Sequence, residues 1–298
     1  MKDKTVIIIL GPTAVGKTAA AIRLALDIQT KIISADSRQC FKELNIGVAK
    51  PGNSELREVP HYFINTHSIV EEVNAAMFEQ LALQYAEEIF RDHDKLVMVG
   101  GTGLYIKAFC EGLDEIPAVE KNIRDSIKEK YDAHGLSWLQ EEIKKHDPEF
   151  YQKGEIFNPQ RVMRALEVKL STGKSFFSFR TTQKKQRPFN TIKVGLHLPK
   201  EELHRHIHHR VDEMMNRGLL DEVNRLVEYK DLNALQTVGY TELFDYLEKK
   251  LTIDEAVEAI KKNTRHYAKR QMTWFRKDGS IQWIQPGHHA LLKKITES

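Results

Sequence analysis

The sequence has only two cysteines, Cys40 and Cys110, and no paired cysteine spacing. So few thiols exclude a zinc ribbon or a disulfide framework and suit a reducing compartment. The chain also lacks an apolar stretch of about 18 residues, which a membrane-spanning helix needs, and an N-terminal segment with the pattern of a signal peptide. We therefore expect a cytoplasmic protein.

Neither sign of charge dominates the chain, which carries 45 Lys and Arg against 42 Asp and Glu, for a formal net charge of +3. An anionic partner must therefore bind at local basic patches rather than to a uniformly basic surface. The apolar fraction of 41% over 298 residues is sufficient for a large buried core.

Strands and helices alternate through the first third of the chain. The apolar, β-branched run at 5–10 is typical of a strand buried on both faces of a parallel sheet. Further strands are predicted at 31–35 and 96–99, with helices over 17–27 and 74–91. This alternation predicts an α/β fold with a doubly wound parallel sheet.

The pattern changes after Leu113, where only helices are predicted as far as residue 189. These helices are expected over 122–131, 137–146 and 158–171. A strand-like run at 191–198 then returns the chain to the sheet. The sequence therefore predicts a core formed by 1–113 and 190–298, with an all-helical insertion domain at 114–189.

A glycine-rich motif, G-x-x-x-x-G-K-[ST], lies between the first strand and the first helix. Its residues are Gly11, Pro12, Thr13, Ala14, Val15, Gly16, Lys17 and Thr18. In such a P-loop the backbone amides and the helix N-terminus bind phosphate groups. Lys17 supplies a positive charge, and the Thr18 hydroxyl can ligate Mg²⁺. We expect a P-loop NTPase-like core that uses Mg²⁺ and binds phosphate groups, and the motif alone would indicate a nucleotide kinase or an ATPase.

The position of the nearest acidic residue is unusual for an enzyme that hydrolyses nucleotides. Such enzymes carry an acid at the end of a second apolar strand, but here that strand ends in Gly100-Gly101. The acid is instead Asp36, which follows a different strand. Asp36 suits a general base beside a leaving diphosphate, and it equally suits a turn cap or a magnesium ligand.

Seven segments, in order, resemble the tRNA dimethylallyltransferases, also called tRNA isopentenyltransferases. They are GPTAVGKT (11–18), SADSRQ (34–39), NIGVAKP (45–51), VGGTGLY (99–105), NPQRVMRALEV (158–168), VGYTEL (238–243) and RHYAKRQMTWFR (265–276). The P-loop is shared with many NTPases, whereas the SADS, GGTGLY and AKRQMTWFR segments together are much more specific.

The resemblance implies transfer of a dimethylallyl group from dimethylallyl diphosphate to a tRNA adenosine. The acceptor would be the exocyclic amine of the adenosine 3′-adjacent to the anticodon (position 37), giving N6-dimethylallyladenosine. Asp36 matches the family's catalytic aspartate, and Lys17, Thr18 with Mg²⁺ and Arg210 would stabilise the leaving group. The role of Arg210 comes from the resemblance alone, because an exposed helix arginine could equally be a surface charge.

The resemblance also implies tRNA contacts, a helical insertion that binds the anticodon stem-loop, and a monomer. The matching tRNA-binding residues are Asp36, Ser37, Arg38, Gln39, Thr102, Arg124, Gln160, Arg161, Val162, Met163, Arg164, Gln236, Thr237, Val238, Gly239, Tyr240 and Thr241. The chain departs from the family pattern at His206, Gln236 and Thr241, where basic residues are common.

The residues at 261–277 support a nucleic-acid partner independently of the resemblance. This stretch carries Lys and Arg without any acid, and Tyr267, Trp274 and Phe275 lie among them. Basic side chains suit phosphate contacts, and aromatic rings can stack on bases. For Trp274 and Phe275 we favour core packing. The helix is expected to begin at Thr252, which has capping-box spacing to Glu255.

Histidines at 204, 206, 208 and 209 form a dense cluster, but no third ligand accompanies the pair at 204 and 208, so we do not predict a zinc site. His288 and His289 are expected to lie in a disordered tail.

Three other functions share parts of the pattern. A prenyltransferase acting on free adenine nucleotide would need neither the insertion nor the basic helix. A nucleotide kinase would need an acid where Gly100-Gly101 stand, and an RNA-binding protein with a relic P-loop would not need Lys17, Thr18 and Asp36 together.

Overall fold

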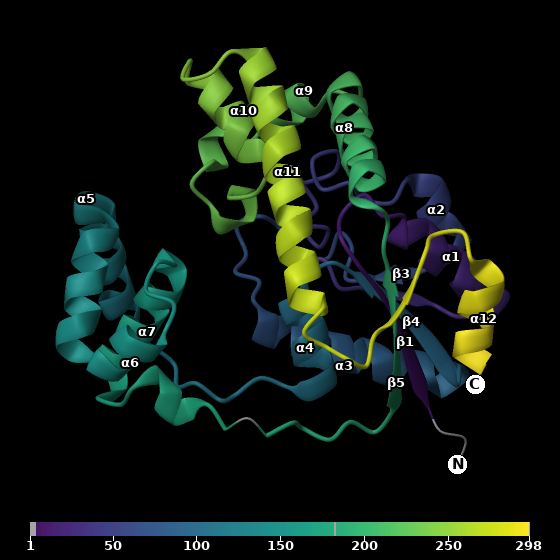
Figure 1. Ribbon diagram of the computed structural model, residues 1–298, viewed down its shortest axis with the longest axis horizontal. Helices are drawn as coiled ribbons and strands as arrows, with labels where there is room; N and C mark the ends of the chain where they lie inside the picture. Colours follow the sequence, from purple (N-terminus) through teal and green to yellow (C-terminus); the bar gives the residue numbers. More distant parts are fainter. Residues whose placement is uncertain (1–3, 182, 298) are drawn as a thin grey trace. The chain divides into compact units, whose positions relative to one another are not determined.

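The computed structural model describes residues 4–181 and 183–297 and divides into two compact units (Figure 1). One unit contains Met1–Glu111 and Gln186–Ser298, and the other contains Gly112–Lys185. The insertion predicted from the sequence spans 114–189. The two units are described separately below.

The first unit is built on a six-stranded sheet in which every strand pair is parallel. The strand order is β3-β2-β4-β1-β5-β6. The strands are β1 (Thr5–Leu10), β2 (Ile32–Ser34), β3 (His61–Tyr62), β4 (Lys95–Gly100), β5 (Asn190–Leu196) and β6 (Gln282–Ile284). The predicted α/β fold is confirmed. Strands β3 and β6 were not predicted from the sequence.

Alternate residues of β1 enter two separate cores on the two faces of the sheet. Val6 and Ile8 belong to one core, and Ile7 and Ile9 belong to the other. All four side chains are fully buried. A strand with this double burial needs a continuous apolar run, which explains the run at 5–10.

Helices cover both faces of the sheet and complete the first unit (Figure 1). They are α1 (Lys17–Asp27), α2 (Asn53–Glu58), α3 (Ala75–Asp92), α4 (Gly103–Glu111), α8 (Lys200–Asn216), α9 (Leu219–Asn224), α10 (Tyr240–Leu247), α11 (Ile253–Phe275) and α12 (His289–Glu297). The expectation of disorder at His289 is wrong, because α12 begins there.

Helix α11 begins at the predicted capping box. The Thr252 side chain accepts a hydrogen bond from the Glu255 amide, and the Glu255 carboxylate accepts one from the Thr252 amide. At the other end Phe275 is buried, as predicted. Trp274 differs, since 38% of it is exposed. Its ring lies so close to Gly103 that a Cβ there would approach Trp274 Cδ1 to 2.2 Å.

The secondary structure of the second unit consists of helices alone in its described residues. It contains α5 (Lys121–His146), α6 (Pro148–Lys153), α7 (Pro159–Thr172) and a 3₁₀ helix (Phe176–Phe179). The two helices predicted over 122–131 and 137–146 are joined into α5, with a kink at Gly135, whose φ of 72° is in the left-handed region that glycine tolerates. Leu139 and Ile143 of α5 pack against Val162 and Leu166 of α7.

Among the described residues, no helix has both the length and the apolar character needed to cross a bilayer.

Candidate active site

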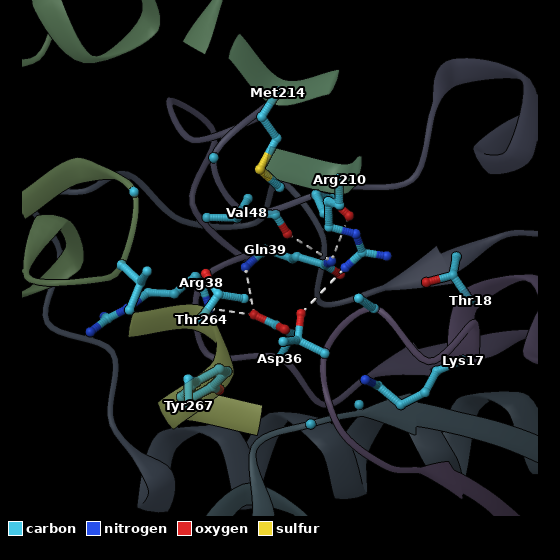
Figure 2. A pocket seen from close by; sticks show the side chains of 18 of the residues that line it. Lys17, Thr18, Asp36, Arg38, Gln39, Val48, Arg210, Met214, Thr264 and Tyr267 are labelled. Atoms are coloured by element: carbon cyan, nitrogen blue, oxygen red, sulfur yellow. Dashed lines mark hydrogen bonds between the residues drawn. The ribbon is translucent and has the colours of Figure 1, made fainter. Parts of the chain in front are cut away.

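The candidate site lies at the carboxyl edge of the sheet, where β1, β2 and β4 end. The P-loop follows β1, Asp36 follows β2, and Gly101 follows β4. Because parallel strands present their carboxyl ends at one edge, these segments meet there. They line a cavity of about 370 Å³ within the first unit (Figure 2).

The P-loop has the backbone that a phosphate cradle requires. Gly11 has φ 146°, and a Cβ there would lie 2.6 Å from the Leu196 carbonyl oxygen, so only glycine fits. Gly16 has φ 93° and is the N-cap of α1, with no side chain to cap the first-turn amides. Those amides and the helix dipole are therefore free to bind an anion.

The structure divides the predicted diphosphate-binding residues into two groups. One group lines the cavity, and its members are Thr13, Ala14, Gly16, Lys17 and Thr18. The other group is buried within the loop, and its members are Gly11, Pro12 and Val15. The second group therefore shapes the cradle rather than facing the cavity.

Lys17 crosses the loop, and its Nζ donates a 2.7 Å hydrogen bond to the Pro12 carbonyl. Its pKa falls to about 7, mainly because burial disfavours the charged form and secondly because the Arg210 guanidinium repels it. The Asp36 carboxylate opposes this shift. An anion bound in the cavity would stabilise the charged lysine.

Arg210 enters the same cavity from α8, although the residues alone were consistent with a surface charge. It lies three residues after buried Ile207, so both side chains share the inward face of the helix. Its Nη1 donates to Thr13 Oγ1 at 3.3 Å, and burial lowers the pKa of the guanidinium. The structure therefore places Arg210 beside the P-loop (Figure 2).

Asp36 uses one carboxylate oxygen for structure. Oδ1 accepts hydrogen bonds from the amides of Arg38 at 2.9 Å and Gln39 at 3.3 Å. Among the hydrogen bonds of the described chain, none reaches Oδ2 of Asp36. The turn-cap and general-base interpretations are therefore compatible, because each can use a different oxygen.

The loop at 45–50 forms one wall of the cavity, and the side chains of Gln39 and Glu222 hold it. Gln39 Nε2 donates to the carbonyls of Val48 at 3.2 Å and Ala49 at 3.1 Å. The buried carboxylate of Glu222 accepts from the amides of Ile46 at 2.8 Å and Gly47 at 3.0 Å.

Tyr240, the first residue of α10, contacts both Glu222 and Gly47 and so links α10 to this wall. Its hydroxyl donates to Glu222 at 2.6 Å, and its ring leaves no room for a Cβ at Gly47. Burial and the adjacent Glu222 carboxylate raise the pKa of Tyr240. The neighbouring Glu242 accepts from the Gly239 amide at 2.7 Å, which fixes the next turn.

Part of the cavity lining is apolar. The apolar side chains are Val48, Val211, Met214, Val238 and Ile260. Helix α11 also contributes polar side chains to the lining, among them Thr264 and Tyr267 (Figure 2). Burial, with a smaller contribution from Asp36, raises the pKa of Tyr267 to about 12, so its ring is neutral.

The residues expected to contact tRNA lie in several environments in the structure. Six line the cavity, namely Asp36, Arg38, Gln39, Thr237, Val238 and Gly239. Thr102 lies beside them, since its Oγ1 accepts from the Ser37 amide at 3.1 Å. Gln236 is exposed and Thr241 is half-buried at the far end of this segment.

Three residues of that set need correction. Val162 and Met163 are buried in the core of the helical unit, and Tyr240 is fully buried beside Glu222. Their side chains pack the interior and are not available for a contact with a partner.

The other expected contact residues lie on the helical unit. Arg124 and Arg164 both pair with the nearly buried Glu167, at 3.6 Å and 3.1 Å. Arg161 pairs with Glu155 at 2.6 Å and remains half-exposed, and Gln160 is exposed beside it. Glu167 therefore holds two arginines in fixed positions on one surface.

Two residues important to the site were missed by the sequence analysis. Glu222 lies in none of the family-like segments, and its role depends entirely on contacts with distant loops. Gln271 lies within AKRQMTWFR, which signals its importance, but no chemistry is evident from its position in the sequence. In the structure it lines the cavity and contacts the P-loop.

The oxygen donors of the cavity suit Mg²⁺ in the presence of a diphosphate. Mg²⁺ usually takes one or two protein oxygens and completes its shell with phosphate oxygens and water. The Thr18 hydroxyl and the Asp36 carboxylate both line the cavity, and no group of three potential metal-ligating side chains is found in the described residues. This donor set fits a metal carried in with a diphosphate.

A phosphate cradle at the end of a parallel sheet, with lysine, arginine and aspartate facing one cavity, defines a P-loop-like α/β enzyme. The chain belongs to the IPP transferase family, whose model matches residues 39–278. A tRNA dimethylallyltransferase 1 of Bacteroides thetaiotaomicron is 45% identical over 95% of this chain and 92% of its own length. A tRNA dimethylallyltransferase of Christiangramia forsetii is 46% identical over 93% and 92%.

Solved structures agree with this assignment. A tRNA isopentenylpyrophosphate transferase from Bacillus halodurans is 34% identical, with a TM-score of 0.71 over 99% of this chain and 94% of that one. A eukaryotic dimethylallyltransferase described as acting on tRNA is 28% identical, with a TM-score of 0.76 over 95% of this chain and 74% of that one.

Proposed function

We propose that this chain transfers the dimethylallyl group of dimethylallyl diphosphate to the exocyclic amine of adenosine 37 in tRNA. The observation that carries the proposal is the convergence of Lys17, Arg210 and Asp36 on one cavity at the P-loop. The names of the relatives support the same reaction.

The diphosphate binds against the amides at the start of α1, with Lys17 and Arg210 beside it. As the bond to the prenyl carbon breaks, negative charge gathers on the diphosphate, and these two cations stabilise that charge in the transition state. Mg²⁺ held by Thr18 and the phosphate oxygens would add further charge neutralisation.

The chemical step forms one bond and breaks another. The lone pair of the adenosine N6 attacks C1 of the allyl group, and the electrons of the C1–O bond leave with the diphosphate. The N6 proton passes to the free Oδ2 of Asp36, while Oδ1 stays bonded to the amides of Arg38 and Gln39. Asp36 is thereby held in place without using the oxygen that accepts the proton.

The apolar part of the cavity suits the prenyl chain. Val48, Met214 and Ile260 offer aliphatic contacts without hydrogen-bonding groups. Such a wall also excludes water, which would otherwise compete with the weakly nucleophilic amine for the allylic carbon.

The acceptor base must leave its stack to enter this cavity, as in other enzymes that modify bases. We propose that the phosphate backbone of the anticodon stem-loop binds basic residues of α11 and of the helical unit. Lys262, Lys269 and Arg270 are exposed on α11, and Arg161 is exposed on α7.

We propose that the protein acts as a monomer in the cytoplasm, as the resemblance and the residue composition lead us to expect.

The kinase alternative finds little support in the site. Gly100 and Gly101 line the cavity where a magnesium-binding acid of a hydrolytic P-loop enzyme would lie, and a Cβ at Gly100 would clash with Ala35. An acid therefore cannot be accommodated there without a shift of the neighbouring strand.

The substrate can be identified by offering labelled dimethylallyl diphosphate with three acceptors: unmodified tRNA bearing adenosine 37, the same tRNA bearing guanosine 37, and AMP. We expect label only in the first. Label in AMP alone would assign the free-nucleotide reaction. Phosphotransfer from ATP without prenyl transfer would assign a kinase.

A further inference from the structure

The side-chain amide of Gln271 connects three segments that are far apart in the sequence. Its Oε1 accepts a 2.8 Å hydrogen bond from the Thr13 amide of the P-loop. Its Nε2 donates a 3.0 Å hydrogen bond to the Gly101 carbonyl at the end of β4. Gln271 itself belongs to α11 and is only 6% exposed; its bond to Gly101 is buried and its bond to Thr13 is partly buried.

The fit around this amide is tight. A Cβ at Gly101 would lie 2.2 Å from Gln271 Nε2, so only glycine admits the amide at that distance. A side chain with two complementary hydrogen bonds and so close a neighbour at Gly101 has a fixed orientation.

The contact continues from Thr13 to a predicted catalytic cation. Thr13 Oγ1 accepts a hydrogen bond from Arg210 Nη1 at 3.3 Å. Gln271 therefore fixes the residue against which Arg210 is oriented. Its bond to the Thr13 amide also means that this N–H points to Gln271 rather than to a bound anion.

We propose that Gln271 is a positioning residue that sets the P-loop at Thr13 and, through Thr13, the guanidinium of Arg210. The anion cradle then consists of the amides that follow Thr13, together with Lys17 and Arg210. The identity of the diphosphate substrate rests on the proposed function. The effect of Gln271 on diphosphate binding can be tested without turnover.

The first test measures binding of inorganic diphosphate with Mg²⁺ by calorimetry in the full chain. Gln271→Met keeps the length of the side chain and removes both hydrogen bonds. We expect the Kd to rise about tenfold, the factor that loss of one to two buried hydrogen bonds corresponds to. Gln84→Met, on the exposed face of α3, is the matched control and should bind as wild type.

Gln271→Glu keeps one of the two hydrogen bonds and removes the other. A carboxylate still accepts from the Thr13 amide but cannot donate to the Gly101 carbonyl, and it adds negative charge beside the diphosphate. We expect its Kd to rise at least as much as that of Gln271→Met. Thermal denaturation of each variant shows whether a change in Kd reflects loss of the fold.

A double-mutant cycle distinguishes positioning from general stability. If Gln271 acts through Arg210, the Kd of Gln271→Met with Arg210→Met should rise by much less than the product of the two single effects. An unchanged Kd in Gln271→Met, or multiplicative effects in the double variant, would overturn the proposal.

Prenyl transfer to tRNA provides a second test of the role of Gln271. In the transfer assay, Gln271→Met should raise the KM for dimethylallyl diphosphate and lower kcat, while tRNA binding stays at the wild-type level. If wild type binds diphosphate and the variant does not, yet neither transfers prenyl to tRNA, then the proposed function fails and the role of Gln271 in the cradle stands.

Discussion

The Arg210 guanidinium faces the same cavity as the Lys17 ammonium and contributes to the lowering of the lysine pKa to about 7. Burial makes the larger contribution, and Asp36 offsets part of the shift. Two cations held together in a buried site repel each other until an anion neutralises them. This arrangement is suited to a ligand that carries several negative charges.

The first prediction concerns the pH dependence of diphosphate binding. Binding of the anion raises the pKa of Lys17, so above pH 7 the complex takes up a proton. The contribution of Lys17 to affinity is complete below about pH 7 and is lost as the pH rises through the pKa of the bound state. Calorimetry in buffers of different ionisation enthalpy measures the uptake directly.

Lys17→Arg is the control for that experiment, because arginine remains charged over the whole range. The ionisation of the diphosphate itself appears in both proteins and cancels in the difference. Equal proton uptake by wild type and Lys17→Arg between pH 7 and pH 9 would show that Lys17 is already charged in the free protein.

The second prediction concerns the wall at Gly47. In Tyr240→Phe, the buried Glu222 carboxylate loses one of its three donors but keeps the amides of Ile46 and Gly47. We expect the free energy of unfolding to fall by about 1–3 kcal/mol, as for a buried charged acceptor left partly unsatisfied. Urea denaturation measures the change.

Tyr229→Phe serves as the matched substitution, since Tyr229 is 43% exposed and its hydroxyl can be replaced by water contacts. It should leave stability within about 0.5 kcal/mol of wild type. Equal stability of the two variants would mean that the Tyr240 hydroxyl contributes nothing to the wall.

The third prediction concerns tRNA binding by the helical unit. Arg161→Ala removes a half-exposed cation at the start of α7. If Arg161 contacts a phosphate, the slope of log Kd against log salt should fall in magnitude by about 0.7–0.9, the value for one released counterion. Filter binding at several salt concentrations gives the slope.

Lys153→Ala tests the specificity of that effect, because Lys153 is an exposed cation of the same unit that also pairs with a glutamate. We expect its salt slope to equal that of wild type. A similar fall for both variants would indicate a diffuse electrostatic attraction rather than a contact at Arg161.

The parts of the site that could be predicted from the sequence are those encoded locally. A β-branched run followed by glycines, a lysine and a helix specifies the P-loop, because each residue acts on its immediate neighbours. Asp36 could be found in the same way, since it lies two residues after the end of the strand β2 (Ile32–Ser34). The helical character of the insertion and the cap at Thr252 also depend on nearby residues.

The parts that could not be predicted depend on packing between distant segments. From the residues alone, Arg210 is recognisable as a site residue only once α8 is packed beside the P-loop, although the family resemblance already implied its role. Gln271 is recognisable only once α11 crosses the end of β4. Strands β3 and β6 contain two and three residues, too few to show an alternating pattern, and they form only because neighbouring strands offer partners.

The central claim is that Asp36 accepts the proton of the attacking amine, and Asp36→Asn tests it most directly. Asparagine keeps an oxygen to accept from the amides of Arg38 and Gln39 but cannot act as a base at neutral pH. Single-turnover transfer to tRNA, with tRNA and dimethylallyl diphosphate both bound, isolates the chemical step. We predict a rate about 10²–10⁴ lower than wild type, with unchanged affinity for both substrates. A rate within a few-fold of wild type would contradict the account and leave Asp36 as a turn cap alone.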